Sequence, residues 1–299
     1  MVVSEALRRV ALTPADAPGG VALSDAALWN QTLDDWRVFI ERGHAVGCHT
    51  DAGELVATAA ALPYGGALGW VAMVLVAPAW RHRGLASALL GDCTRSLRAA
   101  HITPMLDATP AGAPIYRRLG FRDGFELDRW EGLAIDRPSA AGDVAGSTAA
   151  ADVAESTATF DVRRAGLDDL EVLVALDAQA QGVARRFLLH DFLARAGSAA
   201  WVSGDGRGFV MARRGQRATQ IGPLIATDAA QAIQLLVAVL ANVRGPVFVD
   251  VPRRAPGLAE WLAQRGFARQ RPFVRMALGD TPALALHATS FALAGPEFG

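Results

Sequence analysis

The sequence predicts a duplicated α+β fold, in which two tandem units each have a mixed, mostly antiparallel sheet flanked by helices. With 299 residues, the chain is long enough for two domains of ordinary size. Residues 137–159 consist mainly of Ala, Ser, Thr, Gly and Asp, a composition typical of a linker. The sequence RLGF at 118–121 returns as QRGF at 264–267, 146 residues later, which indicates a duplicated domain.

The first unit, residues 1–136, alternates apolar runs with amphipathic stretches. Short apolar runs bounded by Gly, Pro and Asp predict strands, and apolar residues spaced three or four apart predict helices. Gly120, in the C-cap position, ends the last helix. We expect, in order, a strand at 8–12, helical sequence at 15–42 interrupted near Asn30, strands at 44–49, 54–62 and 68–77, a helix at 83–100, a strand at 104–108, a helix at 112–119 and a strand at 121–131.

The second unit, residues 160–299, repeats this order. Its opening strand, FDVRR, precedes acidic helical sequence, as RRVAL at 8–12 does in the first unit. Gly266 ends the last helix in the way that Gly120 does. We expect a strand at 160–164, helices at 167–181 and 184–195, strands at 199–203, 208–213 and 218–225, a helix at 228–243, a strand at 246–251, a helix at 257–265 and a strand at 267–277.

The composition is that of a globular protein without a large charge surplus. Hydrophobic residues make up 52% of the chain and charged residues 20%, with a net charge of −1. Binding to nucleic acid or to an anionic membrane needs a basic surplus or stripe, so we expect neither partner. Cys48 and Cys93 are too few for a disulfide framework or a zinc site, and we expect no metal. Because no signal-like N-terminus or spanning apolar run is found, we expect a cytoplasmic protein.

The most informative segment is GWVAMVLVAPAWRHRGLA at 69–86. An apolar strand meets Pro78, which cannot donate to a sheet, and the chain then turns through RHRG into a long helix. The first turn of a helix leaves N–H groups without partners at the positive end of its dipole, so anions bind there. Gly84 and Ala86 are small enough to let a pyrophosphate approach the backbone. A basic, solvated helix start is the alternative interpretation.

Further along, LDATP at 106–110 is followed by IYRRLGF at 115–121. The order strand, V-x-P, R-x-x-G-x-A, helix, strand and Y-x-x-L-G-F resembles that of the GCN5-related N-acetyltransferase (GNAT) family. With WNQT at 29–32, DW at 35–36 and the second unit, the chain is similar over nearly its whole length to a two-domain bacterial subgroup of that family. The resemblance implies tandem GNAT folds.

The resemblance also implies acetyl-CoA as co-substrate. It places the pantetheine arm along the backbone of Met73, Val74, Leu75 and Val76, and the pyrophosphate at the amides of Arg81, His82, Arg83, Gly84, Leu85 and Ala86. Thr109 stands where many members have Asn, and its hydroxyl can reach a pantetheine carbonyl or a backbone amide. Tyr116 matches the family tyrosine near the thioester sulfur, and is expected to protonate the departing thiolate as general acid. A packing role on the helix face is the alternative.

The second unit lacks the residues of this site. Alanines take the places of Arg81 and Gly84, and Asp228 is expected to cap the helix, where its carboxylate competes for the amides that a phosphate needs. Leu262 takes the place of the tyrosine and cannot donate a proton. We therefore expect a catalytic GNAT domain at 1–136 and a degenerate GNAT-like domain with a C-terminal tail at 160–299.

The sequence offers several candidates for a general base. Asp107, at the end of a strand beside the expected thioester site, is preferred, with a turn residue as an equally good interpretation. The alternatives are Glu126, Asp128, Glu54 and His49. Arg275 is expected to pair with an acid inside the sheet rather than to act in catalysis.

No sequence pattern identifies the acceptor substrate. Four tryptophans of the first unit are expected mostly in the core, with one or two available to an apolar acceptor: Trp29, Trp36, Trp70 and Trp130. Asp34 and Asp35 are expected at a solvated helix start, with attraction of a cation as the alternative.

We expect an N-acetyltransferase that moves an acetyl or acyl group from acetyl-CoA to the amine of a small molecule. The alternatives are a peptide or protein amine as acceptor, and a non-catalytic regulatory protein that binds acyl-CoA. Because a duplicated chain can satisfy contacts that single-domain relatives make by dimerising, a monomer and a homodimer are both compatible with the sequence.

Overall fold

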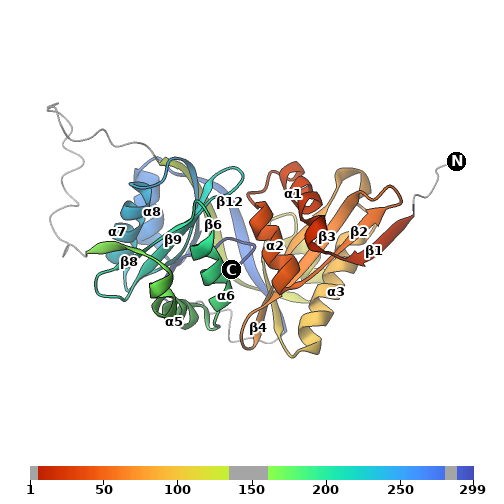
Figure 1. The fold of residues 1–299 in the computed structure, drawn as a ribbon, viewed down its shortest axis with the longest axis horizontal. Helices are drawn as coiled ribbons and strands as arrows, with labels where there is room; N and C mark the ends of the chain where they lie inside the picture. Colours follow the sequence, from red (N-terminus) through yellow and green to blue (C-terminus); the bar gives the residue numbers. More distant parts are fainter. Residues whose placement is uncertain (1–5, 135–160, 280–287) are drawn as a thin grey trace.

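The computed structural model describes residues 6–134, 161–279 and 288–299. It has the expected α+β fold, with strands through the middle of the molecule and helices on both sides (Figure 1). The linker predicted at 137–159 lies outside the described residues. Within the described ranges, no helix is long and apolar enough to cross a membrane.

The elements of the first half lie within a few residues of their predicted places. Thr32 begins α2 with a capping box, because its hydroxyl accepts from Asp35 N while its own N–H donates to the Asp35 carboxylate at 2.8 Å. In chain order, the elements are β1 (Leu7–Ala11), η1 (Pro14–Asp16), α1 (Ala17–Ala26), α2 (Leu33–Arg42), β2 (His44–Thr50), β3 (Leu55–Pro63), β4 (Leu68–Val76), η2 (Pro78–Trp80), α3 (Leu85–Ala99), β5 (Thr103–Ala108), α4 (Ala113–Arg118) and β6 (Phe121–Ala134).

The second half repeats this order and adds one strand that the sequence did not predict, β13. The predicted cap of α7 is confirmed, since the Asp228 carboxylate accepts from Gln231 N at 2.9 Å. In chain order, the elements are β7 (Val162–Ala165), η3 (Leu167–Asp169), α5 (Leu170–Gln181), α6 (Arg186–Ala194), β8 (Ala199–Ser203), β9 (Phe209–Arg213), β10 (Thr219–Ile225), α7 (Ala229–Leu240), β11 (Gly245–Pro252), α8 (Pro256–Gln264), β12 (Ala268–Leu278) and β13 (Ser290–Ala292).

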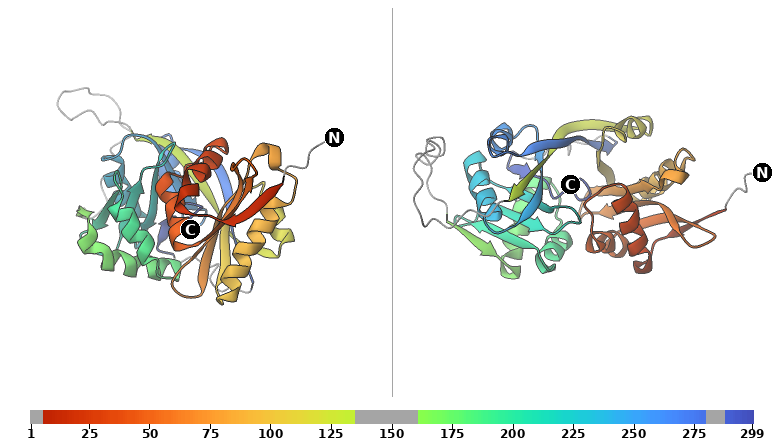
Figure 2. Two further views of the ribbon diagram at one scale, coloured as in Figure 1. Left: turned by 45° about the vertical axis from the view of Figure 1, so that its right-hand side comes forward. Right: turned by 90° about the horizontal axis from the view of Figure 1, so that it is seen from above.

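The two halves exchange their long C-terminal strands. The strand order is β1-β2-β3-β4-β5-β12-β6-β11-β10-β9-β8-β7, so one sheet runs through both halves. β12 of the second half lies between β5 and β6, and β6 of the first half lies between β12 and β11. Figures 1 and 2 show β6 in yellow-green and β12 in blue side by side at the centre of the molecule. Each half therefore completes its sheet with a strand from the other.

β4 and β5 separate along their length. They pair in parallel only from Leu68–Trp70 to Thr103–Met105. Beyond this, β4 bulges at Met73, which has a φ of 54° and whose carbonyl accepts from Thr58 Oγ1 at 2.8 Å. Among the described residues, the edge of β4 that faces β5 has no strand partner from Val71 to Val76. Apart from the Met73 and Val76 carbonyls, which accept from the Thr58 and Arg81 side chains, the backbone groups on this edge are open to a ligand that binds as an additional strand.

The matching gap in the second half is closed by the chain itself. β10 and β11 pair in parallel from Thr219 to Ile221, and then β13 takes the open edge of β10, with Leu224 opposite Ala292 and Ile225 opposite Ser290. Leu293 N also donates to Asp250 O of β11 at 2.9 Å. The tail that carries β13 thus fills the slot of the second half, whereas the equivalent slot of the first half stays open.

After β13 the tail returns to the first half. Trp70 Nε1 donates to Pro296 O at 2.9 Å, and Tyr64 Oη donates to Phe298 O at 2.6 Å. The Phe298 ring stacks on Phe39 of α2 with centroids 5.1 Å apart. These contacts bring residues 296–299 against the same gap between β4 and β5.

Candidate active site

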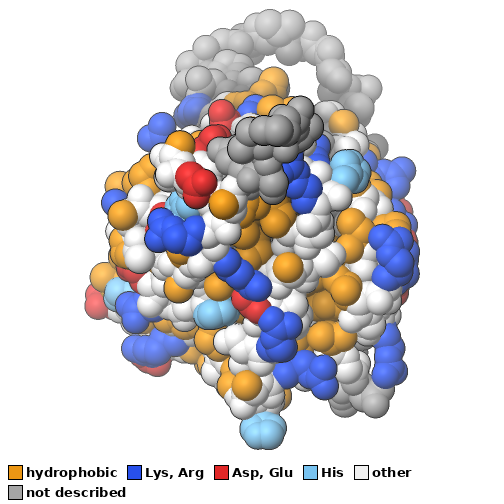
Figure 3. Space-filling model, turned by 90° about the vertical axis from the view of Figure 1, so that its right-hand side faces the viewer, with side chains coloured by type: hydrophobic (Ala, Val, Ile, Leu, Met, Phe, Trp, Pro, Cys, Tyr) orange, Lys and Arg blue, Asp and Glu red, His pale blue; other side chains and the backbone are white. Residues whose placement is uncertain are grey.

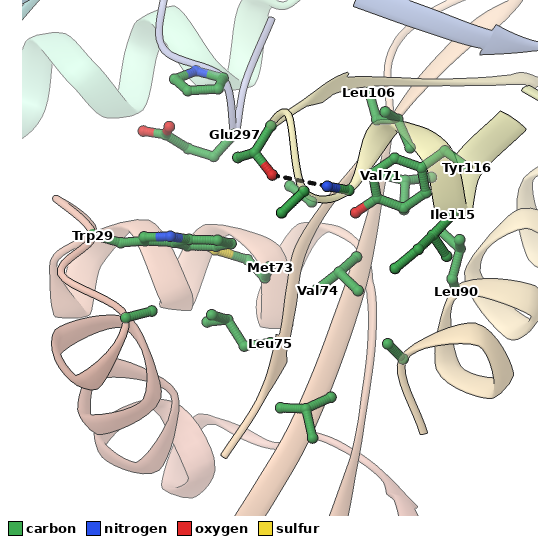
Figure 4. A pocket seen from close by; sticks show the side chains of 18 of the residues that line it. Trp29, Val71, Met73, Val74, Leu75, Leu90, Leu106, Ile115, Tyr116 and Glu297 are labelled. Atoms are coloured by element: carbon green, nitrogen blue, oxygen red, sulfur yellow. Dashed lines mark hydrogen bonds between the residues drawn. The ribbon is translucent and has the colours of Figure 1, made fainter. Parts of the chain in front are cut away.

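A cavity of about 670 Å³ lies at the gap between β4 and β5. The labelled residues of β4 stand between Trp29 and Glu297 on one side and Tyr116 and Ile115 on the other (Figure 4). Most of its wall comes from the first half, and the second half contributes Arg271, Phe273, Pro296 and Glu297. The strand exchange and the returning tail are what bring these four residues to the site.

The predicted co-substrate residues gather in this cavity with one exception. Its wall includes Met73, Val74, Leu75, Val76, Arg81, His82, Gly84, Leu85, Ala86 and Thr109. Arg83 lies outside the wall, with its guanidinium 4.5 Å from the Trp80 ring centroid. Thr109 Oγ1 accepts from Gly112 N at 3.2 Å, so this hydroxyl already supports the turn that leads into α4.

The start of α3 presents a run of unpaired amides. His82 and Gly84 have φ values of 63° and 75°, and these left-handed turns expose the backbone between them. From His82 to Ser87, no N–H has an acceptor within the described part of the chain. Arg81 lines the cavity beside them, its Nε donating to Val76 O at 3.2 Å. Unpaired amides at the positive end of a helix, with a neighbouring guanidinium, suit a phosphate group.

On the face of the first half that points away from the second half, basic side chains outnumber acidic ones (Figure 3). A field of this sign favours the approach of a polyanion such as a nucleotide phosphate.

Tyr116 stands on α4 beside the open edge of β4. Val71, Leu90 and Leu106 surround its ring, and the side chain is partly exposed where it lines the cavity (Figure 4). Desolvation by these apolar neighbours raises the pKa of Tyr116 to about 12. The phenol is therefore protonated at neutral pH, and its hydroxyl makes no hydrogen bond to any residue that the structure describes.

Asp107 is held by Arg275. Arg275 Nε and Nη2 each donate to one carboxylate oxygen at 2.9 Å, which confirms the prediction that Arg275 pairs with an acid inside the sheet. The Asp107 side chain is fully buried although the residue is partly exposed, so Asp107 meets the cavity through its backbone. Burial raises the pKa of Asp107, with Arg275 acting in the opposite direction. Its role as general base stays a prediction.

The alternative bases do not line the cavity. Arg253 pairs with both Glu126 and Asp128, His49 Nε2 lies 3.0 Å from Asp16 Oδ1, and Glu54 is also outside the wall.

Of the four tryptophans considered for the acceptor, Trp29 lines the cavity. The other three are buried in the core: Trp36, Trp70 and Trp130. The expected solvation of the helix start is wrong for Asp35, which is 2% exposed and bonded to Arg195 Nη1 at 2.6 Å. Burial acts to raise the pKa of Asp35, but the Arg195 and Arg213 guanidiniums hold it below its usual value. No local pattern in the sequence points to these two arginines, because both belong to the second half.

Sequence reasoning also missed the acidic residue at the cavity wall, Glu297. Arg213 donates to its Oε1, and its Oε2 has no partner among the described residues. Burial raises the pKa of Glu297, while Arg213 lowers it. The PEFG ending of the tail is a visible motif, but only the fold shows that it enters the site.

Comparisons with known proteins agree with this geometry. Two family models, both described as acetyltransferase (GNAT) domain, match residues 37–123 and 173–290, together more than half of the chain. A comparison with curated proteins found no match.

Solved structures with the same fold cover nearly the whole chain. A proposed acetyltransferase from Pyrococcus horikoshii superposes with a TM-score of 0.77 at 18% identity, covering 98% of this chain and 96% of the other. A tandem GNAT protein from the clavulanic acid biosynthesis pathway gives 0.60 at 16% identity, covering 92% and 100%. A GCN5-related N-acetyltransferase from Kribbella flavida gives 0.57 at 22% identity, covering 95% and 74%.

The fold and the open slot beside β4 define an acyl-CoA-dependent transferase of the GNAT type. The chain belongs to the GCN5-related N-acetyltransferase family and carries two GNAT domains in tandem.

Proposed function

We propose that this protein is an N-acetyltransferase that moves an acetyl group from acetyl-CoA to the amine of a small molecule by direct attack. The observation that carries this proposal is the combination of an unpaired β4 edge with unpaired amides at the start of α3. An extended pantetheine arm would pair with Val71 to Val76, and the pyrophosphate would meet the amides of His82 to Ser87. The donor is the substrate that supplies the acetyl group.

Tyr116 is the proposed general acid. Its Oη keeps its proton at neutral pH and faces the cavity next to the β4 edge, where the thioester of an arm bound along β4 would lie. Proton donation from Tyr116 Oη to the departing sulfur would prevent the thiolate from attacking the new amide.

A small acceptor is favoured because residues of the second half form part of the cavity wall. The second half contributes Pro296 and Glu297 of the tail and Arg271 of β12 to the wall, and Glu297 lies across the cavity from Tyr116 (Figure 4). A peptide acceptor would need an open groove at this place. A cytoplasmic location stays a prediction from the sequence; both cysteines, Cys48 and Cys93, are free and buried.

Calorimetric titration with acetyl-CoA and with free CoA, followed by measurement of CoA release with a set of amines, tests the proposal. We expect one donor site per chain, since β13 fills the slot of the second half. Acetyl-CoA binding without CoA release for any amine would instead favour the regulatory alternative. No binding at all would refute the proposal.

A further inference from the structure

The cavity wall opposite Tyr116 contains a carboxylate with unused hydrogen-bonding capacity. Glu297 is 6% exposed, and although Arg213 donates to its Oε1, no described residue donates to Oε2. The side chain extends beside Trp29 (Figure 4). A buried carboxylate oxygen without a donor is unfavourable, and such oxygens in folded proteins are normally satisfied by a ligand or by water. Glu297 also lines the cavity, so a donor group that reaches Oε2 after a shift of this side chain would be stabilising.

A second acceptor of this kind lies on the loop between α1 and α2. Gln31 lines the cavity, is 4% exposed, and its Oε1 has no partner among the described residues. The neighbouring Asn30 fixes this loop to the second half, because its Oδ1 accepts from Arg217 N at 2.9 Å and from Ala218 N at 3.0 Å. A primary ammonium has three N–H donors and a positive charge, and so matches a carboxylate and an amide oxygen.

The cavity wall also contains two guanidiniums, those of Arg129 and Arg271. Arg129 donates Nε and Nη2 to Asp250 at 2.9 and 2.8 Å, which leaves Nη1 without a partner among the described side chains. Arg271, whose Nε donates to Gln270 Oε1 at 3.2 Å, has no carboxylate partner in the described ranges. Burial lowers the pKa of Arg271, and the neighbouring Arg129 adds to this effect, while Asp250 and Glu131 act in the opposite direction. An anionic group between the two guanidiniums would relieve their repulsion.

We propose that this wall is an acceptor subsite for an amine that also carries an anionic group, as an amino acid does. The subsite comprises Trp29, Gln31, Arg129, Arg271 and Glu297. Glu297 and Gln31 bind the ammonium, and Arg271 with Nη1 of Arg129 binds the anion, because a guanidinium matches carboxylate and phosphate geometry. This inference rests on the proposed function, for which it names the class of acceptor.

The protons balance in this arrangement. The amine nitrogen forms a bond to the thioester carbonyl carbon, and the C–S bond breaks. Of the two protons that leave the ammonium, one passes to the Glu297 carboxylate and then to solvent. The other replaces the proton that Tyr116 Oη gives to the sulfur. The products are the amide, free CoA and one released proton.

Binding to the protein–CoA complex tests the subsite without turnover. The full-length protein is saturated with CoA and titrated calorimetrically with pairs of amines, in which one member carries an anionic group and the other lacks it. Four pairs test a carboxylate: glycine and methylamine, β-alanine and ethylamine, 4-aminobutyrate and propylamine, and L-phenylalanine and phenethylamine. A fifth pair, 2-aminoethyl phosphate and ethanolamine, tests a phosphate. At least one anionic member should bind about 10- to 100-fold more tightly than its partner, the effect of a charge-assisted contact. The phosphate pair distinguishes a phosphate-bearing acceptor from a carboxylate-bearing one.

Three variants test which residues bind the anionic group of the acceptor and which bind its ammonium. Arg271→Gln should remove the preference for the anionic amine and leave the affinity for the other amine of the pair unchanged. Glu297→Gln should lower the affinity for both amines. Arg269→Gln is the matched control, since Arg269 is an arginine of the same strand that lies outside the cavity wall. Acetyl-CoA affinity should stay unchanged in all three variants, and a weaker affinity in Arg271→Gln would show that this arginine serves the donor instead.

Three outcomes would overturn the subsite: equal binding within every pair, a preference that survives in Arg271→Gln, or no binding by any amine. Release of CoA with carboxylate-free amines would then leave the proposed function standing. Failure of acetyl-CoA itself to bind would refute the proposed function, and so the two failures are distinguishable.

Discussion

Tyr116 shows how burial sets the chemistry of a single residue. Its ring lies among apolar side chains of β4, α3 and β5, and its pKa of about 12 keeps the proton on Oη at every pH at which such a protein is usually assayed. Because the acidic form is present below the pKa, raising the pH toward 9 should not remove the proton of the proposed general acid. Any loss of turnover at lower pH belongs to another group, namely the one that must accept a proton from the amine.

Tyr116→Phe should lower turnover by about 10²- to 10⁴-fold, the usual contribution of a general acid. The affinity for acetyl-CoA should stay nearly intact, because the phenyl ring fills the same apolar site. Steady-state CoA release and calorimetry measure the two effects separately. A fully active variant on a confirmed acceptor would leave Tyr116 as a packing residue.

Asp107→Asn separates the structural role of Asp107 from the catalytic one. The ion pair with Arg275 is buried on both sides, and removal of one partner leaves a buried unpaired charge, so the free energy of unfolding should fall by about 3–5 kcal/mol. Denaturant unfolding measures this change. Asp123→Asn, which breaks an exposed pair with Arg117, is the control and should change stability little. Unchanged stability with a large loss of turnover would instead support Asp107 as the base.

Some residues of the candidate site could be predicted from the sequence and others could not. The motif order was enough to select Tyr116 and ten of the eleven predicted co-substrate residues, all of which line one cavity. It was not enough for Glu297 or Arg271, because their neighbours in space come from the other half of the chain. Local spacing carries no information on such contacts.

At the scale of elements, the start of α3 separates the roles of Arg81 and Arg83, which the sequence motif treats alike. Arg81→Ala should weaken acetyl-CoA binding about tenfold, because Arg81 lines the cavity beside the unpaired amides. Arg83→Ala should change the affinity much less, since its guanidinium stacks on Trp80 outside the wall. Calorimetry on both variants checks this. Equal losses would mean that Arg83 leaves Trp80 and joins the site when the ligand binds.

Element prediction succeeded where the signal is local. Apolar periodicity, Pro78 and the glycines at helix ends gave each long strand and helix to within a few residues. β13 was missed, because three residues in a small-residue tail carry no periodicity and become a strand only by pairing with β10. The insertion of β13 also explains why the second half has no open slot. The sequence alone indicated the loss of this site only through the missing Arg, Gly and Tyr.

At the scale of the whole molecule, duplication and strand exchange make one unit from two copies. β6 and β12 are equivalent last strands of the two halves, and each lies in the sheet of the other. Buried pairs such as Arg129–Asp250 and Arg195–Asp35 then join the halves through charges that would be unpaired if the halves separated. The active cavity depends on this union, because it needs walls from both halves.

Cutting the chain tests this exchange directly. With a protease site placed in the predicted linker at 137–159, the cleaved protein should elute at the mass of the intact chain and bind acetyl-CoA with unchanged affinity. The reason is that β6 of the first piece is paired on both edges by β11 and β12 of the second, so separation would break two strand pairings and open both cores. Size-exclusion chromatography before and after denaturant measures association. Two pieces that part in native buffer, each with an intact circular dichroism spectrum, would mean that the halves are self-contained domains and that each keeps its own last strand.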